Sequence, residues 1–130
     1  LYDEFQCSIV AVQEVPMTEI DKYGVVAGTL ERAGLTRVTE MVEKPPQEEA
    51  PSNLAVIGRY ILTSDIFDAI RGTPPGRNGE VQLTDALQVQ AREGRVLAYK
   101  FDGLRFDCGS VPGFVEATQH VYEHYYGRDD

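Results

Sequence analysis

The chain of 130 residues carries 12 lysines and arginines against 21 aspartates and glutamates, which gives a formal net charge of -9. This length predicts one domain, and a fold of this size buries roughly two thirds of the surface of its unfolded chain, so it needs no disulfide or structural metal. The acidic balance argues against nucleic acids and anionic membranes as partners, because proteins bind such polyanions mainly with Lys and Arg. It does not exclude a small phosphorylated ligand, since two or three local donors can hold one phosphate.

Targeting signals and cysteines give no sign of a secreted or membrane protein. No apolar run approaches the roughly 20 residues of a membrane span, and Leu1 to Gln6 lacks the basic and apolar regions of a signal peptide. Cys7 and Cys108 are the only cysteines, so the sequence has neither a disulfide framework nor a zinc pattern. We therefore expect a soluble, cytoplasmic protein with two free thiols. The chain begins without methionine and enters strand-like sequence at once, which suggests a piece of a longer protein.

The first half of the chain predicts strands joined by short connections. The apolar, β-branched run at 8–12 predicts a buried strand. A turn of helix at 17–23 and strands at 24–27 and 36–42 follow, with a polar turn between the two strands. The segment 44–52, KPPQEEAPS, contains three prolines and predicts a surface loop without regular structure.

The second half predicts helices interleaved with further extended segments. The most apolar stretch, 54–62, runs into residues of N-cap type that predict a helix at 65–71. A second helix opens at 78–80 and ends at Gly94, with its apolar residues four apart on one face. These apolar residues are Leu83, Leu87 and Ala91.

The end of the chain predicts a strand at 96–101, a short extended piece at 106–109 and a helix at 112–126. Pro112 near the start of this helix and Gly127 after its end fit the usual asymmetry of helix ends. One stripe of the helix is formed by Phe114, Val115, Thr118, Val121, Tyr122 and Tyr125. Strands interleaved with helices predict an α/β fold with a mixed sheet.

Glu43 and Lys44 form the first candidate site, at the end of a predicted strand and directly before two prolines. A carboxylate can accept hydrogen bonds from two adjacent hydroxyls, and a lysine ammonium can reach a phosphate oxygen, so the pair suits a sugar phosphate. Ligands of α/β sheets also bind beyond the carboxyl ends of strands. On spacing alone, a solvated surface pair is the commoner interpretation.

Asp107 is the second candidate. A carboxylate between Phe106 and Cys108 is costly to bury without a cation or donors, and Mg²⁺ held by one or two carboxylates plus substrate phosphates would offset that cost. The alternative, which a lone aspartate favours, is that Asp107 caps the last helix or the turn before it. His120 and His124 are four residues apart on the same helix, but without a third ligand we interpret them as two histidines on a wet face. No residue predicts a protein nucleophile, and the chain has no phosphate-binding glycine loop.

Five strings, in this order and spacing, resemble the carboxy-terminal part of bacterial UTP:glucose-1-phosphate uridylyltransferases. They are YGVV at 23–26, VEKP at 42–45, APSNLAVIGRYILT at 50–63, GEVQLTDA at 79–86 and RFDCGS at 105–110. The resemblance extends from about Ser8 to about Gly113. Other sugar-phosphate nucleotidyltransferases, including glucose-1-phosphate thymidylyltransferases, share the shorter elements, whereas the longer strings resemble the uridylyltransferases more closely.

The resemblance implies that this chain is the mixed-sheet part of a Rossmann-like, three-layer nucleotide-diphospho-sugar transferase. It implies formation of UDP-glucose and pyrophosphate from UTP and glucose 1-phosphate, with Mg²⁺ as cofactor, by a homo-oligomer. Carried over by residue, Gly24 would offer its backbone to the sugar, Glu43 would accept from glucose hydroxyls, and Lys44 would contact the sugar phosphate. Asp107 would be one of two metal-binding carboxylates. In this chain alone we expect Asp107 to turn towards water or towards backbone donors near Gly109.

The resemblance also implies that part of the enzyme lies outside this chain. The glycine-rich loop of the family and its other metal-binding aspartate would precede Leu1, so residues 1–130 would form one sugar-binding domain, inactive without the nucleotide-binding part. Ser110, Val111 and Pro112 stand where the family usually has an acidic or polar residue and then a lysine. Two alternatives stay open: a non-catalytic relative that binds sugar phosphate or a partner enzyme, and a glucose-1-phosphate thymidylyltransferase.

Overall fold

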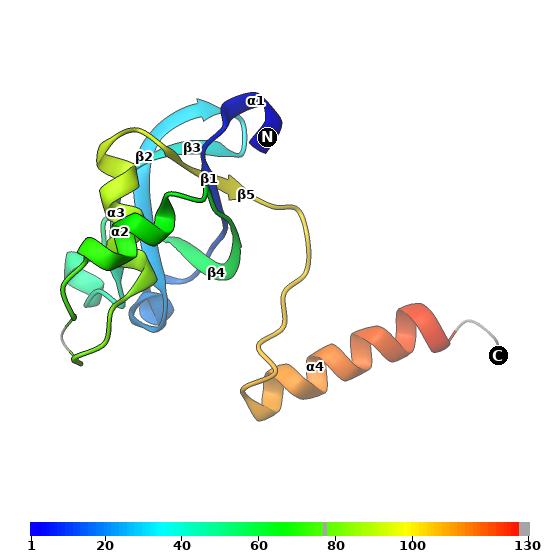
Figure 1. The fold of residues 1–130 in the computed structure, drawn as a ribbon. Helices are drawn as coiled ribbons and strands as arrows, with labels where there is room; N and C mark the ends of the chain where they lie inside the picture. Colours follow the sequence, from blue (N-terminus) through cyan, green and yellow to red (C-terminus); the bar gives the residue numbers. More distant parts are fainter. Residues whose placement is uncertain (77, 128–130) are drawn as a thin grey trace.

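The computed structural model describes residues 1–76 and 78–127. Its body is a ring of five strands in the order β1-β4-β2-β3-β5, closed by the pairing of β5 with β1 (Figure 1). β1 and β5 run parallel and the other neighbouring pairs are antiparallel, so the sheet is mixed, as predicted. The strands are β1 (Ser8–Glu14), β2 (Gly24–Arg32), β3 (Leu35–Glu43), β4 (Leu54–Ile61) and β5 (Val96–Lys100).

β2 and β3 form a long hairpin that the sequence predicted only in part. The register pairs Gly24 with Glu43 at one end and Arg32 with Leu35 at the other. The strand predicted at 24–27 therefore continues to Arg32, although the side chains beyond Ala27 are exposed. It continues because β3 supplies backbone partners along its whole length, whereas the prediction stopped where the apolar run stopped.

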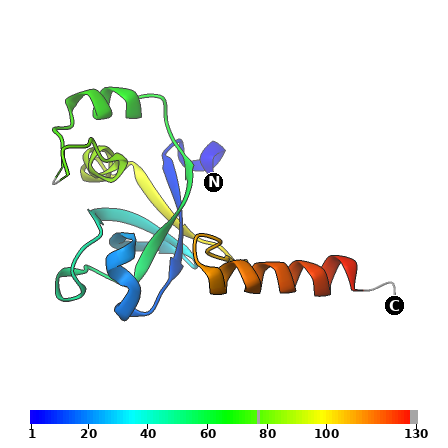
Figure 2. The same ribbon diagram turned by 90° about the horizontal axis from the view of Figure 1, so that it is seen from below.

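Two helices cover one side of the ring. α3 (Leu83–Arg92) packs against β3, and α2 (Ile66–Gly72) packs against α3 (Figure 2). The predicted apolar face of α3 is confirmed, because Leu87 and Ala91 are buried and Leu83 packs against the same core cluster. The core cluster consists of Val10, Val12, Val26, Val38, Met41, Val56, Ile66, Ala86, Leu87, Ala91, Val96 and Ala98.

The ends of α3 differ in how well the sequence predicted them. Gly94 ends the helical segment as predicted, with a φ of +72° and its amide donating to the carbonyl of Ala91 at 2.9 Å. The helix was predicted to open at 78–80, whereas α3 begins at Leu83. Gly79 has a φ of +79°, and the Glu80 amide donates to Asn78 Oδ1 at 3.3 Å, so this stretch is a turn that precedes the helix.

The short elements lie at the margins of the ring. They are α1 (Tyr2–Phe5), η1 (Met17–Lys22) and η2 (Gln47–Glu49). α1 brings Tyr2 and Phe5 onto a second small apolar cluster, and η1 confirms the predicted turn of helix. The expectation of no regular structure at 44–52 was wrong for η2, a single 3-10 turn that begins after Pro46, whose ring fixes φ at a value that suits a helix start.

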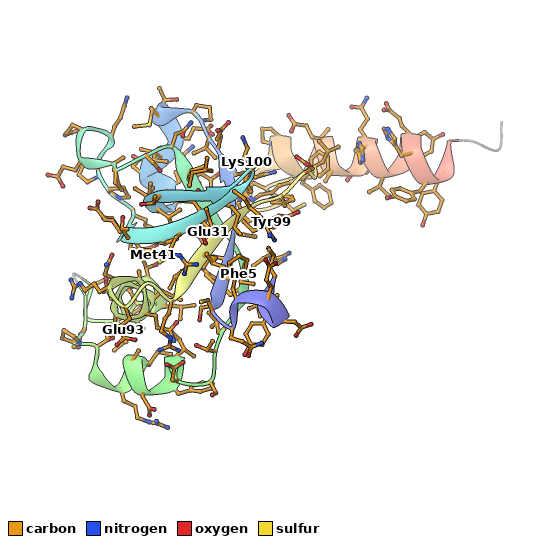
Figure 3. The ribbon with its side chains drawn as sticks, turned by 90° about the horizontal axis from the view of Figure 1, so that it is seen from above. Phe5, Glu31, Met41, Glu93, Tyr99 and Lys100 are labelled. Atoms are coloured by element: carbon orange, nitrogen blue, oxygen red, sulfur yellow. The ribbon has the colours of Figure 1, made fainter. Side chains whose placement is uncertain are left out.

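α4 (Val111–Val121) and its continuation η3 (Tyr122–Tyr126) stand apart from the ring at the end of an extended segment, 101–110 (Figures 1 and 2). Ser110 caps α4 by accepting from the Gly113 amide at 3.2 Å. The predicted apolar stripe falls on this helix, but its side chains stand clear of the ring, and Phe114 and Tyr125 are 60% and 74% exposed (Figure 3). The described helices include none that is both long and apolar enough to cross a membrane.

Candidate functional site

Gly24, Glu43 and Lys44 meet at one edge of the ring, where β2 begins and β3 ends. Gly24 and Glu43 are register partners, and the Lys44 amide donates to the carbonyl of Tyr23 at 3.0 Å, which extends the ladder by one rung. The hairpin therefore brings these three predicted site residues together, although 18 residues lie between Gly24 and Glu43 in the sequence. Backbone pairing alone sets their spacing.

The Glu43 carboxylate is held by elements on two sides. Thr84, in the first turn of α3, donates from its Oγ1 to Glu43 Oε2 at 2.7 Å. Gly24 is buried, and a Cβ at this position would lie 3.0 Å from the same Oε2 and 3.6 Å from Thr84 Oγ1. Gly24 thus leaves the space that the carboxylate occupies, and α3 supplies the donor that orients it.

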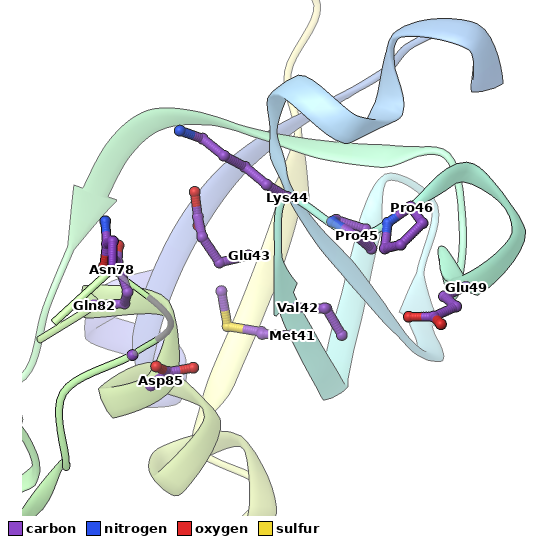
Figure 4. A pocket seen from close by; sticks show the side chains of 11 residues that line it. Met41, Val42, Glu43, Lys44, Pro45, Pro46, Glu49, Asn78, Gln82 and Asp85 are labelled. Carbon is purple, nitrogen blue, oxygen red and sulfur yellow. The ribbon is translucent and has the colours of Figure 1, made fainter. Parts of the chain in front are cut away.

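Lys44 has a backbone conformation that is unusual for its residue type. Its φ is 45°, in the left-handed region, which costs a non-glycine residue about 1 to 2 kcal/mol. Pro45 follows, and a residue before proline disfavours α-type conformations. Such strain persists where the surrounding structure over-determines the backbone, and it concentrates at functional sites. The left-handed turn sends the exposed Lys44 side chain out beside Glu43 (Figure 4).

A cavity of about 420 Å³ lies at this edge of the ring (Figure 4). Glu43 and Lys44 reach it from the end of β3, and Asn78, Gln82 and Asp85 reach it from α3 and the segment before it. The complete lining is Met41, Val42, Glu43, Lys44, Pro45, Pro46, Glu49, Gly76, Asn78, Gln82 and Asp85. Carboxylates and amides suit the hydroxyl groups of a ligand, and a single ammonium suits one anionic group.

Two further side chains belong to this edge of the ring. Burial and then the charge of Glu43 raise the pKa of the Tyr60 hydroxyl, which places this tyrosine within electrostatic reach of the carboxylate. Arg105 lies with its guanidinium 5.2 Å from the centre of the Tyr23 ring and donates to the Tyr23 hydroxyl at 3.3 Å. This contact ties the segment that carries Asp107 to the residue before Gly24.

Asp107 lies outside the cavity of Glu43 and Lys44 and lines a second cavity of about 400 Å³, with Arg59 and Arg105. In this chain the Asp107 side chain is exposed to solvent, as expected for the chain alone, so its burial supplies no argument for a cation here. Its Oδ1 accepts from the Gly109 amide at 3.0 Å, which confirms the expected turn towards backbone donors. The predicted extended piece at 106–109 closes into this turn, where the Ser110 amide donates to the Asp107 carbonyl at 3.2 Å.

The described residues hold no group of three or more His, Cys, Asp or Glu side chains that could bind a metal ion by themselves. His120 and His124 stack with their ring centres 4.0 Å apart, and His124 Nδ1 lies 2.9 Å from the His120 carbonyl oxygen. A lone exposed carboxylate such as Asp107 fits Mg²⁺ only as one part of a site completed by other groups, which is the usual manner of Mg²⁺ binding to phosphate substrates.

Sequence reasoning missed Thr84, Tyr60 and Arg105 as members of the site. Thr84 lies within the string GEVQLTDA, which contributed to the family resemblance but to which we assigned no site residue. Its partner Glu43 is 41 residues earlier, so no local pattern joins the two. The available signal was a hydroxyl residue on the buried face of a helix, which needs a hydrogen-bond partner.

Comparisons with known proteins agree with the geometry of the chain. Residues 3–124 match the family described as "Nucleotidyl transferase". A UTP--glucose-1-phosphate uridylyltransferase of Pseudomonas aeruginosa (strain PAO1) is 64% identical over 126 residues, 97% of this chain and 45% of that protein. A solved UDP-glucose pyrophosphorylase complexed with UDP-glucose aligns with a TM-score of 0.88 and 55% identity over 94% of this chain and 46% of its own. A UTP-bound UGPase from Acinetobacter baumannii aligns with a TM-score of 0.78 and 38% identity over 96% of this chain and 43% of its own.

The chain spans about half the length of the relatives that it matches. The structural alignments extend over nearly all of it, which confirms the predicted α/β fold as a part of the nucleotidyltransferase fold. The sequence identity likewise confirms the resemblance to uridylyltransferases. Because the family match covers all but a few residues at each end, the chain belongs to the nucleotidyl transferase family.

Proposed function

We propose that the full-length protein catalyses the formation of UDP-glucose and pyrophosphate from UTP and glucose 1-phosphate, and that residues 1–130 form its sugar-binding, carboxy-terminal domain. The observation that carries the proposal is the grouping of Gly24, Glu43 and Lys44 at one edge of the ring beside a cavity of about 420 Å³. The relatives named above, which are uridylyltransferases and UDP-glucose pyrophosphorylases, support the same reaction.

Each of the three residues has a separate task in binding glucose 1-phosphate. Glu43 accepts hydrogen bonds from sugar hydroxyls, since an ionised carboxylate is a pure acceptor. Gly24 lets the sugar approach the backbone, because its missing side chain leaves the carboxylate and the ligand room. Lys44 places an ammonium group on the sugar phosphate, a contact worth about 1.5 to 3 kcal/mol because it is charge-assisted.

The reaction needs no protein nucleophile. A phosphate oxygen of glucose 1-phosphate attacks the α-phosphorus of UTP, the bond from that phosphorus to the β-phosphate oxygen breaks, and pyrophosphate leaves with the electron pair. The protein contributes by aligning the attacking oxygen and by neutralising charge, which are the main contributions in transfers of this kind. Lys44 does both for the attacking phosphate, since it fixes one phosphate oxygen and lowers its repulsion from the triphosphate.

Asp107 is our proposed contribution of this domain to a Mg²⁺ site. The carboxylate is exposed and, within the part of the chain that the structure describes, only its Oδ1 accepts a hydrogen bond, from the Gly109 amide, so it can hold a cation together with groups from outside this chain. Bound Mg²⁺ would supply positive charge to the phosphates of the substrates. The arginine contact on Tyr23 supports this placement, because it tethers the Asp107 segment to the edge of the ring that holds Glu43 and Lys44.

The apolar stripe of α4 supports the proposed division into two parts. Phe114, Val115 and Tyr122 are each more than half exposed on a helix that stands apart from the ring. The relatives carry more than half of their length beyond the matched region. We propose that the stripe packs against the nucleotide-binding part of the full-length protein and so carries Asp107 to the nucleotide.

An assay of the purified full-length protein tests the proposed function. We expect it to form UDP-glucose from UTP and glucose 1-phosphate in the presence of Mg²⁺, measured by chromatography of the nucleotide sugar. Glu43→Ala and Lys44→Ala should each raise the KM for glucose 1-phosphate and leave the KM for UTP unchanged. Lys100→Ala is the matched control, because Lys100 pairs with Glu14 at 3.1 Å and belongs to β5, away from the cavity lining.

Two outcomes would contradict this function. Faster turnover with dTTP than with UTP would make the protein a thymidylyltransferase. Tight binding of glucose 1-phosphate without turnover of any nucleotide would make it a non-catalytic binding relative.

Two further expectations stay predictions. The free thiols of Cys7 and Cys108 support action in the reducing cytoplasm, which localisation of the tagged protein by fractionation checks. The homo-oligomer implied by the resemblance is checked by the mass of the full-length protein in light scattering.

A further inference from the structure

We propose that Thr84 is a positioning residue that fixes the orientation of the Glu43 carboxylate in which it accepts from the sugar. The proposal rests on the proposed function, because it assigns Thr84 a task only if Glu43 binds glucose 1-phosphate. It adds an uncharged residue to the site, to which the string GEVQLTDA at 79–86 did not by itself assign a role.

The hydrogen bond of Thr84 differs from those of comparable threonines in the chain. Thr73 and Thr118 each donate from Oγ1 to the carbonyl four residues earlier, at 2.6 and 2.8 Å. Such back-bonding is the usual arrangement for threonine in or at the end of a helix. Thr84 instead donates to Glu43 Oε2, on another element, at 2.7 Å. Thr84 is the second residue of α3, so no carbonyl of its own helix lies four residues before it, and its hydroxyl bonds the carboxylate of another element instead.

The support for Thr84 is rigid. Its side chain is 7% exposed, and the next two buried residues of α3, Ala86 and Leu87, are fully enclosed in the core. The hydroxyl therefore has a fixed position from which to hold Oε2. A hydrogen bond to an ionised acceptor is stronger than one between neutral groups, so rotation of the carboxylate away from Thr84 is unfavourable.

Gly24 leaves the space in which the carboxylate meets Thr84. An added Cβ at Gly24 would stand 3.0 Å from Oε2 and 3.6 Å from Thr84 Oγ1, and the first distance is tighter than nine in ten real contacts of a Cβ. Glycine at this position therefore lets Oε2 take its place beside the Thr84 hydroxyl. Oε1 is left as the oxygen that can turn to the cavity, and its direction is set before any sugar arrives. A preorganised acceptor lowers the ordering cost of binding.

Kinetics of the full-length protein test the proposal. Thr84→Val keeps the branched shape and removes the donor, so we expect the KM for glucose 1-phosphate to rise about tenfold, the effect of losing a charge-assisted hydrogen bond. The KM for UTP should stay unchanged. Thr84→Ser restores the donor and should recover most of the lost affinity. Thr73→Val is the matched control, since Thr73 is 9% exposed and makes a hydrogen bond of similar length to a carbonyl.

A double-mutant cycle separates positioning from a general structural role. In a Glu43→Ala background, Thr84→Val should raise the KM for glucose 1-phosphate no further, because the group that Thr84 orients is absent. An equal rise in both backgrounds would overturn the proposal. An unchanged KM for Thr84→Val alone would overturn it as well.

Calorimetric titration with glucose 1-phosphate separates failure of this proposal from failure of the proposed function. If wild type forms UDP-glucose and Thr84→Val binds the sugar phosphate as tightly as wild type, the function stands and the positioning role fails. If wild type forms none but its affinity for glucose 1-phosphate depends on Thr84, the reaction fails and the positioning role stands. If wild type does not bind glucose 1-phosphate, both fail.

Discussion

The edge of the ring that carries Glu43 and the arm that leaves the ring after β5 differ in how firmly each holds its candidate carboxylate. At the edge, Glu43 is fixed by a strand register, a helix side chain and a glycine before any ligand binds. On the arm, residues 101–126, Asp107 is exposed, and among the described residues its Oδ1 accepts a hydrogen bond only from the amide of Gly109, two residues away in the same turn. The sugar site that we propose at the edge is therefore preorganised, whereas the metal site that we propose on the arm needs groups from outside this chain.

The difference follows from what each region packs against. The edge belongs to a closed ring with a buried core, so backbone and helix positions are fixed by many apolar contacts. The arm carries its apolar residues on the outside. The ring contacts the first part of the arm through Arg105 and Tyr23, whereas the exposed apolar stripe of α4 needs another part of the protein to cover it. We expect changes at the edge to act on sugar binding and changes on the arm to act on turnover.

Activity of residues 1–130 alone would contradict this contrast between edge and arm most strongly. We expect the purified chain to form no measurable UDP-glucose from UTP and glucose 1-phosphate, because much of the stabilisation of the transition state would come from groups outside it. Chromatography of the products, with the full-length protein as the positive control, measures this. Turnover by the chain near the rate of the full-length protein would show that the arm needs no further partner.

Asp107→Asn in the full-length protein tests the arm directly. Asn keeps the shape and loses the charge, so we expect turnover to fall by orders of magnitude and the Mg²⁺ concentration for half-maximal rate to rise. The KM for glucose 1-phosphate should change little. Asp102→Asn is the control, since Asp102 is an exposed aspartate of the same segment. An unchanged Mg²⁺ dependence with a lowered melting temperature would make Asp107 a structural cap of the turn.

Lys44 offers a test of the edge in which two small substitutions are compared. Lys44→Ala and Lys44→Gly both remove the ammonium group, so both should raise the KM for glucose 1-phosphate by about one to two orders of magnitude, which corresponds to roughly 1.5 to 3 kcal/mol. They should differ in stability. Because φ at this position is 45°, glycine relieves a strain that alanine keeps, and we expect Lys44→Gly to be more stable by about 1 kcal/mol.

Urea unfolding of the two Lys44 variants measures that difference. At an ordinary extended position the order would be reversed, because glycine loses more backbone entropy on folding. A more stable Lys44→Ala would therefore show that the left-handed backbone is not strained. An unchanged KM for both variants would show that Lys44 is only a solvated surface charge.

Three of the residues at the edge of the ring could be chosen as candidates from the sequence, but a fourth could not. Gly24, Glu43 and Lys44 could be named because each stands in a short string with a family resemblance, and strand pairing then brings the strings together. Thr84 also stands in one of these strings, but the string does not pair it with Glu43, because the bond between them spans 41 residues and depends on where α3 is placed on the ring. Local patterns report which residues can do chemistry, whereas packing decides which of them meet.

On the arm, the sequence predicted the local structure but not the surroundings of its side chains. The helix and its apolar stripe were predicted correctly from periodicity, and so was the stop at Gly127. Asp107 is exposed although Phe106 and Cys108 flank it, because apolar neighbours along the chain do not bury a residue by themselves. Periodicity fixes which face of a helix is apolar but not what covers it.

The smallest expected effect concerns a polar cluster formed by Thr63, Asp65 and Arg95, next to the start of α2 and the end of α3. Arg95 Nη1 lies 2.6 Å from Asp65 Oδ2, and the Thr63 hydroxyl donates to Asp65 Oδ1. These hydrogen bonds, with that of Arg95 the larger cause, lower the pKa of Asp65 from its ordinary 3.8 to about 2. Since the folded state favours the charged form, Asp65 contributes stability above about pH 4 that is lost as the pH falls through about 2.

Asp65→Asn should therefore destabilise the chain at pH 7 and lose that disadvantage in acid. The Asp65 side chain is 41% exposed, so solvent screening limits the expected loss to about 1 kcal/mol. Urea unfolding of wild type and variant at pH 7 and near pH 2 measures the gap, which should shrink between about pH 4 and pH 2. Asp68→Asn is the control, because its ion pair with Arg71 is 80% exposed on the aspartate side and contributes little at any pH. A gap for Asp65→Asn that is equal at both pH values would mean that the neutral hydrogen bonds of the carboxyl group, and not its charge, hold this side of the ring.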